Sequence, residues 1–216
     1  MKKILCPSMM CADYDNLATS TAELDQAGAD VFHCDVMDGC FVPNIAMGLQ
    51  DIKTVRKNTR KPIDVHLMIE KPAGKVDWFI DAGADIVYIH PESERYCIKT
   101  LRHIRNRGVK AGIAINPDTS IETVRELLAH RDYVLAMSVT PGFAGQRFIE
   151  SVKGKLIKLA ELKKKYGFIL TLDGACSPEK IKELSEAGVD GFILGTSSLF
   201  GTRRDYKNIL TELRNL

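Results

Sequence analysis

Short apolar runs alternate with longer amphipathic stretches along the whole chain. The runs, at residues 4–9, 31–37, 63–68, 85–90, 111–115, 133–139, 168–173 and 191–195, have the length and composition of buried strands. Between them lie stretches with the spacing of one-sided helices, among them 94–107, 120–129, 150–165 and 178–187. Eight such strand-and-helix units predict an α/β protein that folds as a (β/α)8 TIM barrel.

A recurring phrase supports this interpretation. AGADVFHCD begins at Ala27, AGADIVYIH at Ala82 and AGVDGFILG at Ala187, and each joins a helix end, a glycine stop and an apolar run. The second phrase begins 55 residues after the first, and the third begins 105 residues after the second. One barrel unit takes about 25 to 30 residues, so these intervals correspond to two and four units. No linker divides the chain, and we expect residues 1–216 to form one domain. A doubly wound open sheet is disfavoured, because no GxGxxG follows the first run.

Several of the predicted strands place polar or sulfur-containing side chains on one face. Alternation puts His33, Asp35 and Met37 on the same side of residues 31–37. The other positions, at or near the carboxyl ends of four further strands, are Ser8, His66, Met68, Met137 and Asp173. Barrel chemistry lies at the carboxyl ends of the strands. If the inward faces coincide, two histidines and two aspartates therefore converge at the mouth, above three methionines.

Two imidazoles and two carboxylates suit one divalent ion such as Zn²⁺, Fe²⁺, Mn²⁺ or Co²⁺, whereas Mg²⁺ is less favoured. A single strand histidine is more often a hydrogen-bonded core residue, and methionine more often fills gaps. The joint pattern across three strands favours a site. His90, His103 and His130 are given no functional role at this stage.

Three loops rich in small residues follow the last three strands. They read PGFAGQ, DGACS and GTSSLF, and small residues let backbone N–H groups approach an anion. Loops after the seventh and eighth strands commonly bind phosphate in barrels, although glycine also simply makes turns. The candidate phosphate-binding residues are Gly142, Phe143, Ala144, Gly145, Gly174, Ala175, Gly195, Thr196 and Ser197.

The composition excludes several classes of function. Thirty Lys and Arg residues against 28 Asp and Glu residues leave a net charge of only +2, with no basic stripe for nucleic acid. No apolar window is long enough for a membrane span, and Pro7 and Ser8 interrupt the only apolar start that could suggest a signal peptide. Six cysteines without a CxxC pair suit reduced thiols and a cytoplasmic protein.

The motifs together resemble the ribulose-phosphate 3-epimerase family nearly from end to end. The matching phrases are PSMMCADY, HCDVMDGCFVPN, DVHLM, INPDT, MSVTPGFAGQRF, LDGACS and GTSSLF. The resemblance implies a metal-dependent enzyme that inverts carbon 3 of a small phosphorylated ketose, and we expect a homo-oligomer. It implies that His33, Asp35, His66 and Asp173 hold the metal and that Asp35 and Asp173 are the paired acid and base.

The same resemblance assigns further roles. Ser8, Met37, Met68 and Met137 are expected to contact the substrate, and the GCFVPN loop at 39–44 resembles a flap over the site. The commonest pentulose pattern reads PSIL[SA]AD, DGG and GS where this chain has PSMMCAD, DGAC and GTSSLF. Those differences, together with HPE at 90–92, look more like the allulose-6-phosphate 3-epimerase branch. We therefore favour D-allulose 6-phosphate over D-ribulose 5-phosphate.

Two other functions agree less well with the sequence. A metal-dependent aldolase or decarboxylase would want a lysine at the mouth or another means of stabilising a carbanion, and no strand end supplies an obvious lysine. A non-catalytic sugar-phosphate-binding barrel would lack one of the two Asp or two His residues, and all four are present.

Overall fold

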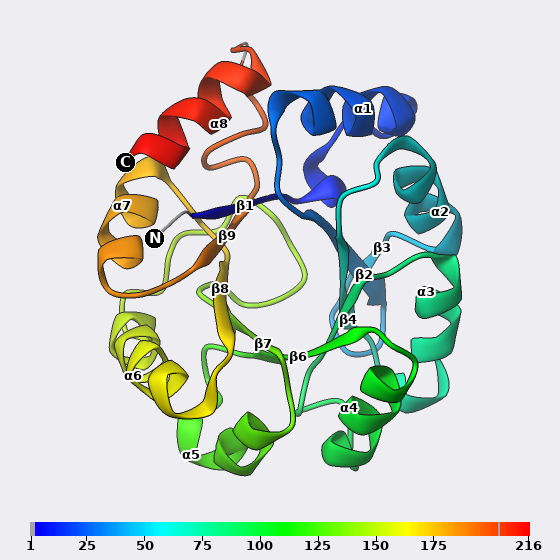
Figure 1. The fold of residues 1–216 in the computed structure, drawn as a ribbon, viewed down its shortest axis with the longest axis vertical. Helices are drawn as coiled ribbons and strands as arrows, with labels where there is room; N and C mark the ends of the chain where they lie inside the picture. The colour runs from blue at the N-terminus through cyan, green and yellow to red at the C-terminus, as the bar shows by residue number, and fades with distance from the viewer. Residues whose placement is uncertain (1–2, 203) are drawn as a thin grey trace.

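The computed structural model describes residues 3–202 and 204–216. A ring of parallel strands lies inside a ring of helices, as the sequence predicted (Figure 1). The strands of the ring are β1 (Ile4–Pro7), β2 (Phe32–Asp38), β4 (Ile63–Met68), β5 (Ile86–Ile89), β6 (Lys110–Ile115), β7 (Tyr133–Met137), β8 (Ile169–Asp173) and β9 (Gly191–Leu194). A parallel bridge between Ser8 and His33 joins the first two strands and closes the ring.

One strand was not expected from the sequence. The two residues of β3 (Ile45–Ala46) pair antiparallel with the end of β2, with Met37 opposite Ala46. Such a short pairing has no periodicity to detect, because alternation needs several residues. It holds the returning end of the loop at residues 39–44 beside the mouth of the barrel.

The helices of the described residues are α1 (Leu17–Ala27), α2 (Leu49–Asn58), α3 (Val76–Ala82), α4 (Cys97–Asn106), α5 (Ile121–Val124), α6 (Val152–Tyr166), α7 (Pro178–Glu186) and α8 (Tyr206–Asn215). The stretch predicted at 120–129 is only partly α-helical, since a 3-10 turn at Arg125–Ala129 follows α5. The three recurring phrases do end helices: Gly28, Gly83 and Gly188 all have positive φ. None of the described helices is long and apolar enough to cross a bilayer.

Strand alternation separates two apolar regions. Phe32, Cys34 and Val36 of β2 face outward and join the large core between strands and helices. The inward positions of the ring form a smaller core that includes Cys6, Tyr88, Leu135, Met137 and Ile193. Toward one end of this interior, buried polar side chains such as His33, Asp35 and His66 take the place of apolar ones.

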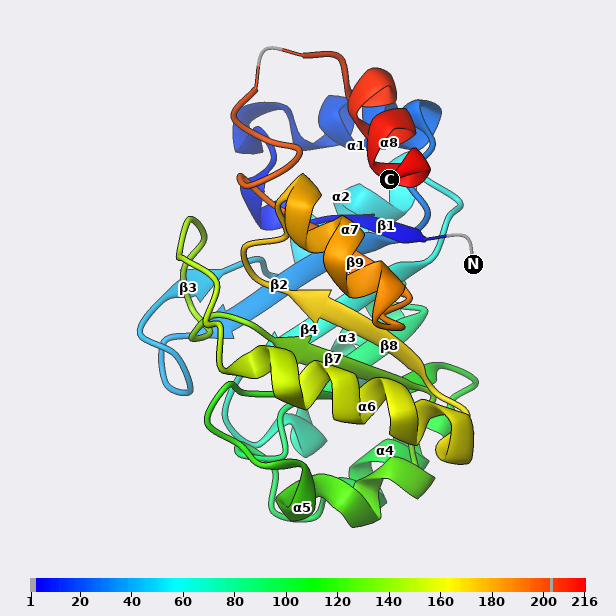
Figure 2. The ribbon, with the colours of Figure 1, turned by 90° about the vertical axis from the view of Figure 1, so that its left-hand side faces the viewer.

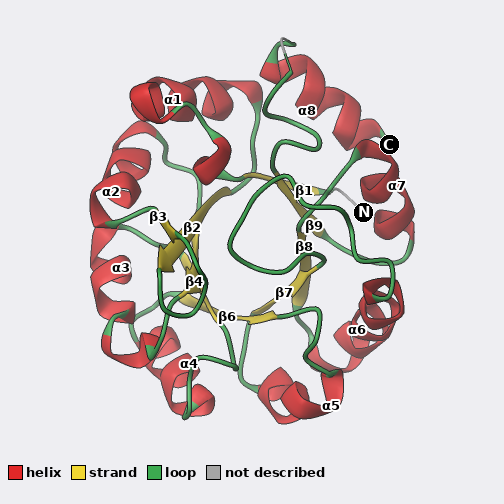
Figure 3. Ribbon diagram, turned by 180° about the vertical axis from the view of Figure 1, so that it is seen from behind, coloured by secondary structure: helices red, strands yellow, loops and turns green. Residues whose placement is uncertain are grey.

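That end is the mouth formed by the carboxyl ends of the strands. Viewed from the side, the arrows of the ring point toward the edge where β3 lies (Figure 2). Viewed from behind, loops cross the opening of the ring (Figure 3). The predicted functional residues therefore lie beneath and within these loops.

Candidate metal and substrate site

The four predicted metal ligands meet at the mouth of the barrel. Parallel pairing sets Asp35 of β2 opposite His66 of β4, and Asp173 ends β8 on the far side of the ring. One ligand atom from each of His33, Asp35, His66 and Asp173 lies within 4.8 Å of the others. Strand alternation predicted each inward direction, and the closure of the barrel brings the four together.

His33 is held between two carboxylates and is fully buried. Its Nδ1 contacts Oδ1 of Asp64, and its Nε2 lies 3.0 Å from Oδ1 of Asp35. A carboxylate against Nδ1 favours a proton on that nitrogen, which leaves the lone pair of Nε2 directed toward the cluster. Sequence reasoning gave no role to Asp64, although its inward position two residues before His66 in IDVHLM was a usable signal.

His66 is also fully buried and has two different neighbours. Its Nδ1 lies 3.2 Å from Asp35 Oδ1 and 3.7 Å from Asp173 Oδ2. Its Nε2 lies 2.7 Å from Nε2 of His90, which is likewise fully buried at the end of β5. His90, given no role from the sequence, is thus the direct partner of a predicted ligand.

The donor set fits a divalent cation. Once Asp64 holds a proton on Nδ1 of His33, an unprotonated Nε2 faces the carboxylate of Asp35. Two lone-pair donors facing each other at this distance repel unless a metal ion or a second imidazole proton lies between them. Mixed imidazole and carboxylate donors are those that Zn²⁺ and other first-row divalent metals take in catalytic sites.

The charges of the metal-free cluster are strongly unequal. Burial tends to raise the pKa of Asp35, but the charge of His33 and the hydrogen bond from His33 outweigh it and lower that pKa. Burial and the adjacent Asp35 raise the pKa of Asp173 to about 7. Burial opposes protonation of His33, but Asp64 and Asp35 raise its pKa well above the usual value. Any metal that binds here must therefore displace protons.

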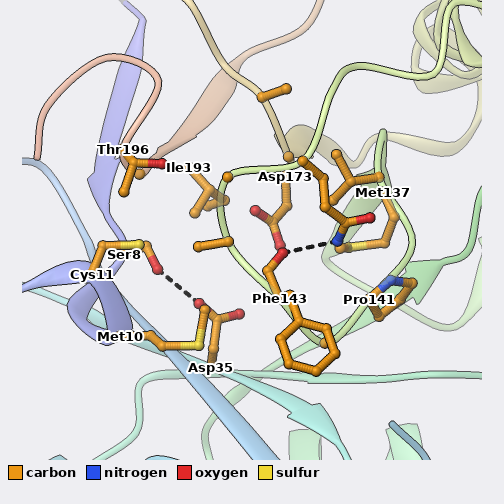
Figure 4. A pocket seen from close by; sticks show the side chains of 18 of the residues that line it. Ser8, Met10, Cys11, Asp35, Met137, Pro141, Phe143, Asp173, Ile193 and Thr196 are labelled. Carbon is orange, nitrogen blue, oxygen red and sulfur yellow. Dashed lines mark hydrogen bonds between the residues drawn. The ribbon is translucent and has the colours of Figure 1, made fainter. Parts of the chain in front are cut away.

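Asp35 and Asp173 both line a cavity at the mouth of the barrel. Asp35 and Asp173 point toward each other across it, and Ser8 Oγ donates to Asp35 Oδ2 at 2.8 Å (Figure 4). Met37, Met68 and Met137, predicted as substrate contacts, also line it. The space amounts to about 540 Å³ when the open solvent at its mouth is included.

All of the residues predicted to bind phosphate line the same cavity. The loops that supply them follow β7, β8 and β9, and no lysine or arginine is among the described residues that line the cavity. Gly174 has φ +106°, and a Cβ there would come within 2.6 Å of a Val139 methyl group, so this position requires glycine. An anion here would meet mainly backbone N–H groups.

Ala175 is unusual among the lining residues, because it adopts φ +47° without being glycine. A left-handed conformation costs a residue with a Cβ roughly 1–2 kcal/mol. Such strain persists only where the surrounding structure holds the residue in that conformation.

The loop at 39–44 contacts both the histidine side of the site and the predicted phosphate loop after β7. Phe41 packs on the ring of His90 with 4.9 Å between centroids. Asn44 Nδ2 donates to the carbonyl of Gly142 at 2.7 Å, which joins this loop to the predicted phosphate loop after β7. The loop is therefore in contact with both His90 and the predicted phosphate loop, and its role as a flap stays a prediction.

Known proteins resemble this chain in sequence and fold. A family model described as the ribulose-phosphate 3 epimerase family matches residues 4–200. Ribulose-phosphate 3-epimerase from Aquifex aeolicus (strain VF5) is 39% identical over 216 residues, covering 99% of this chain and 95% of the relative. The protein of that name from Bacillus subtilis (strain 168) is 38% identical over 213 residues, covering 97% of each.

A solved structure is similar in fold alone. The 3-keto-L-gulonate-6-phosphate decarboxylase from Vibrio cholerae O1 biovar El Tor superposes with a TM-score of 0.73 at 14% identity, covering 100% of this chain and 98% of that one. At this identity the likeness supports the barrel architecture and nothing about the reaction.

Proposed function

Because this chain belongs to the ribulose-phosphate 3 epimerase family and is therefore an enzyme of the isomerase class, we propose that it epimerises carbon 3 of a small phosphorylated ketose with one divalent metal ion. The observation that carries the proposal is the pair of carboxylates, Asp35 and Asp173, which face each other across the cavity (Figure 4). Epimerisation removes a proton from one face of carbon 3 and returns one to the other face. Two carboxylates on opposite strands can serve both faces.

In the forward direction one aspartate breaks the carbon 3–hydrogen bond, and the electron pair passes into an enediolate with the neighbouring ketone. The other aspartate then donates a proton to the opposite face of carbon 3, and the ketone re-forms. The two residues exchange roles when the reaction runs backward. A divalent ion held by His33, His66 and the two aspartates would supply Lewis-acid stabilisation of the enediolate charge.

The remaining lining residues position the sugar. Ser8 holds Asp35 through its hydroxyl group and can also meet a substrate hydroxyl. The thioethers of Met37, Met68 and Met137 offer polarizable surface without an exchangeable proton near carbon 3. Phosphate binding in the loops after β7, β8 and β9 would supply remote binding energy that fixes the position of carbon 3.

We favour D-allulose 6-phosphate, converted to D-fructose 6-phosphate, as the substrate. The motif differences from the commoner pentulose pattern concern Cys11, Ala175, Cys176 and Thr196, and all four line the cavity. The Ala175 methyl group is kept at a backbone conformation that suits glycine, which is the residue of the commoner DGG pattern. A sugar one carbon longer requires a different spacing between metal and phosphate, and this end of the cavity is where the spacing can change.

D-ribulose 5-phosphate, converted to D-xylulose 5-phosphate, is the second candidate. It is favoured by the names of the curated relatives, which are ribulose-phosphate 3-epimerases.

For the protein as a whole we infer a homo-oligomer from the family, which light scattering can test. We infer a cytoplasmic location from six cysteines that form no disulfide.

The decisive experiment compares kcat/KM for the two sugar phosphates with one metal-loaded sample. We expect D-allulose 6-phosphate to be preferred, with carbon 3 exchanging its proton with deuterated solvent and no carbon–carbon bond cleaved. A preference for D-ribulose 5-phosphate of tenfold or more, about 1.4 kcal/mol, would assign the second candidate. Absence of turnover of either sugar would contradict epimerase activity itself.

A further inference from the structure

A chain of side chains extends from the predicted ligand His66 to the surface on the side away from the cavity. His66 Nε2 lies 2.7 Å from His90 Nε2, and the two rings stack with centroids 4.9 Å apart. The other nitrogen of His90, Nδ1, faces Glu92 Oε2 at 3.4 Å. Glu92 is anchored in turn by the backbone N–H of Asn116 at 3.2 Å and by the hydroxyl of Thr119.

Two nitrogens at hydrogen-bond distance share one hydrogen, so one imidazole donates and the other accepts. The carboxylate of Glu92 favours the tautomer of His90 that has its hydrogen on Nδ1. His90 Nε2 is then the acceptor, and His66 must donate from its own Nε2. A neutral His66 with hydrogen on Nε2 has its lone pair on Nδ1, the atom that faces Asp35 and Asp173.

From this geometry we propose that His90 and Glu92 are positioning residues that hold His66 in the tautomer able to bind a metal. The inference rests on the proposed function for its metal, but not on which sugar is the substrate. His90 would then do for His66 on β4 what Asp64 does for His33 on β2, because each fixes which imidazole nitrogen has the proton. It also assigns a role to Phe41, whose ring packs on His90 and shields this contact from water.

Two substitutions of His90 distinguish a positioning role from a role in packing alone, because the two roles predict opposite orders of metal affinity. In His90→Gln the side-chain amide reaches about as far as Nε2 and can still accept from His66. In His90→Phe the ring is kept for stacking on His66 and Phe41, but the acceptor is lost. A packing role predicts that phenylalanine is tolerated better, whereas a positioning role predicts that glutamine is.

The experiment titrates each metal-free protein with Co²⁺ and follows visible absorbance and heat. We expect His90→Gln to stay within about fivefold of the parent and His90→Phe to lose about 10- to 100-fold in affinity. Glu92→Gln should lie between them. Glu122→Gln, the same change at an exposed carboxylate that pairs with Arg125 and not with His90, is the matched control and should bind like the parent.

A second measurement needs no metal. Nitrogen-15 shifts of labelled histidines should show mainly the Nε2–H tautomer of His66 in the parent, and a shift toward the Nδ1–H tautomer, which the nearby Asp35 favours, in His90→Phe. The same tautomer populations in parent and His90→Phe, a reversed order of the two His90 variants, or the same loss in Glu122→Gln as in Glu92→Gln would overturn the proposal. A parent that binds no Co²⁺ would instead contradict the metal of the proposed function, and the nitrogen shifts would still decide the role of His90.

Discussion

His33 and Asp64 lie opposite each other in the register of β2 and β4, and Nδ1 of the imidazole contacts Oδ1 of the carboxylate. Both side chains are almost wholly buried. The contact directs the second imidazole nitrogen toward Asp35, so a residue without any access to the cavity orients one that belongs to the metal cluster.

Removing the Asp64 carboxylate should weaken metal binding without emptying the cluster. Asp64→Asn keeps an oxygen that can accept from His33, so we expect a loss of no more than about tenfold in Co²⁺ affinity. Asp64→Leu leaves the His33 nitrogen without a partner and should lose about 10- to 100-fold, with about 1–3 kcal/mol of unfolding free energy. Equal Co²⁺ titrations for the two variants would contradict this role of Asp64.

Metal removal should stop turnover and leave the barrel folded, and His66→Ala should reduce metal content and activity together.

The pKa of Asp173, raised to about 7 by burial and by Asp35, should make metal affinity depend on pH. Below pH 7 the proton on this carboxyl competes with the metal, so apparent affinity should fall by about tenfold per pH unit for each proton displaced. Unchanged metal stoichiometry in His66→Ala, or affinity that does not vary between pH 6 and 8, would be the contrary results.

Asp35→Asn and Asp173→Asn should each abolish net epimerisation, because each removes the base for one face of carbon 3. The two variants should differ in which epimer still exchanges its carbon 3 proton with deuterated solvent. Proton NMR of both sugars follows the exchange, and metal content is measured in each variant as the control. Turnover close to that of the parent in either variant is incompatible with two bases.

Gly195→Val tests the phosphate loops. Gly195 is not in the left-handed region, and an added Cβ would meet Cys11 Sγ at an ordinary 3.5 Å, so the loop should keep its fold. The larger side chain narrows the cavity, and we expect KM to rise by about tenfold or more, with kcat lower as well if phosphate binding positions carbon 3. Gly195→Ala is the control and should stay near the parent. A dephosphorylated ketose turned over as well as the phosphorylated one would refute phosphate binding here.

Ala175→Gly tests the choice between the two sugars. Relief of the left-handed strain is offset by the greater chain entropy of glycine, so the unfolding free energy should change by less than about 1 kcal/mol. The ratio of kcat/KM values should move toward D-ribulose 5-phosphate, because without the methyl group the phosphate of the shorter sugar can approach the metal more closely at this loop. Ala144→Gly removes a methyl group from the same cavity at a residue with negative φ and should leave the ratio unchanged.

Local periodicity was enough to predict much of this molecule. Alternation along β2 and β4 predicted that His33, Asp35 and His66 face the barrel interior, because side-chain direction on a strand depends only on the residue's own position. The small residues after β7 and β8 likewise predicted the loops that line the cavity. Each of these inferences uses residues that are neighbours in the chain.

Only the tertiary structure decided which side chains touch. In the sequence, Asp64 and His90 are simply polar residues on predicted strands. In the structure, strand register places Asp64 against His33, and ring stacking places His90 against His66. The sequence by itself determined the strands, their inward faces and the kind of chemistry at their ends. The partners of each imidazole, and hence which nitrogen is free to bind a metal, depend on contacts between residues distant in the chain, which barrel closure creates and local periodicity does not encode.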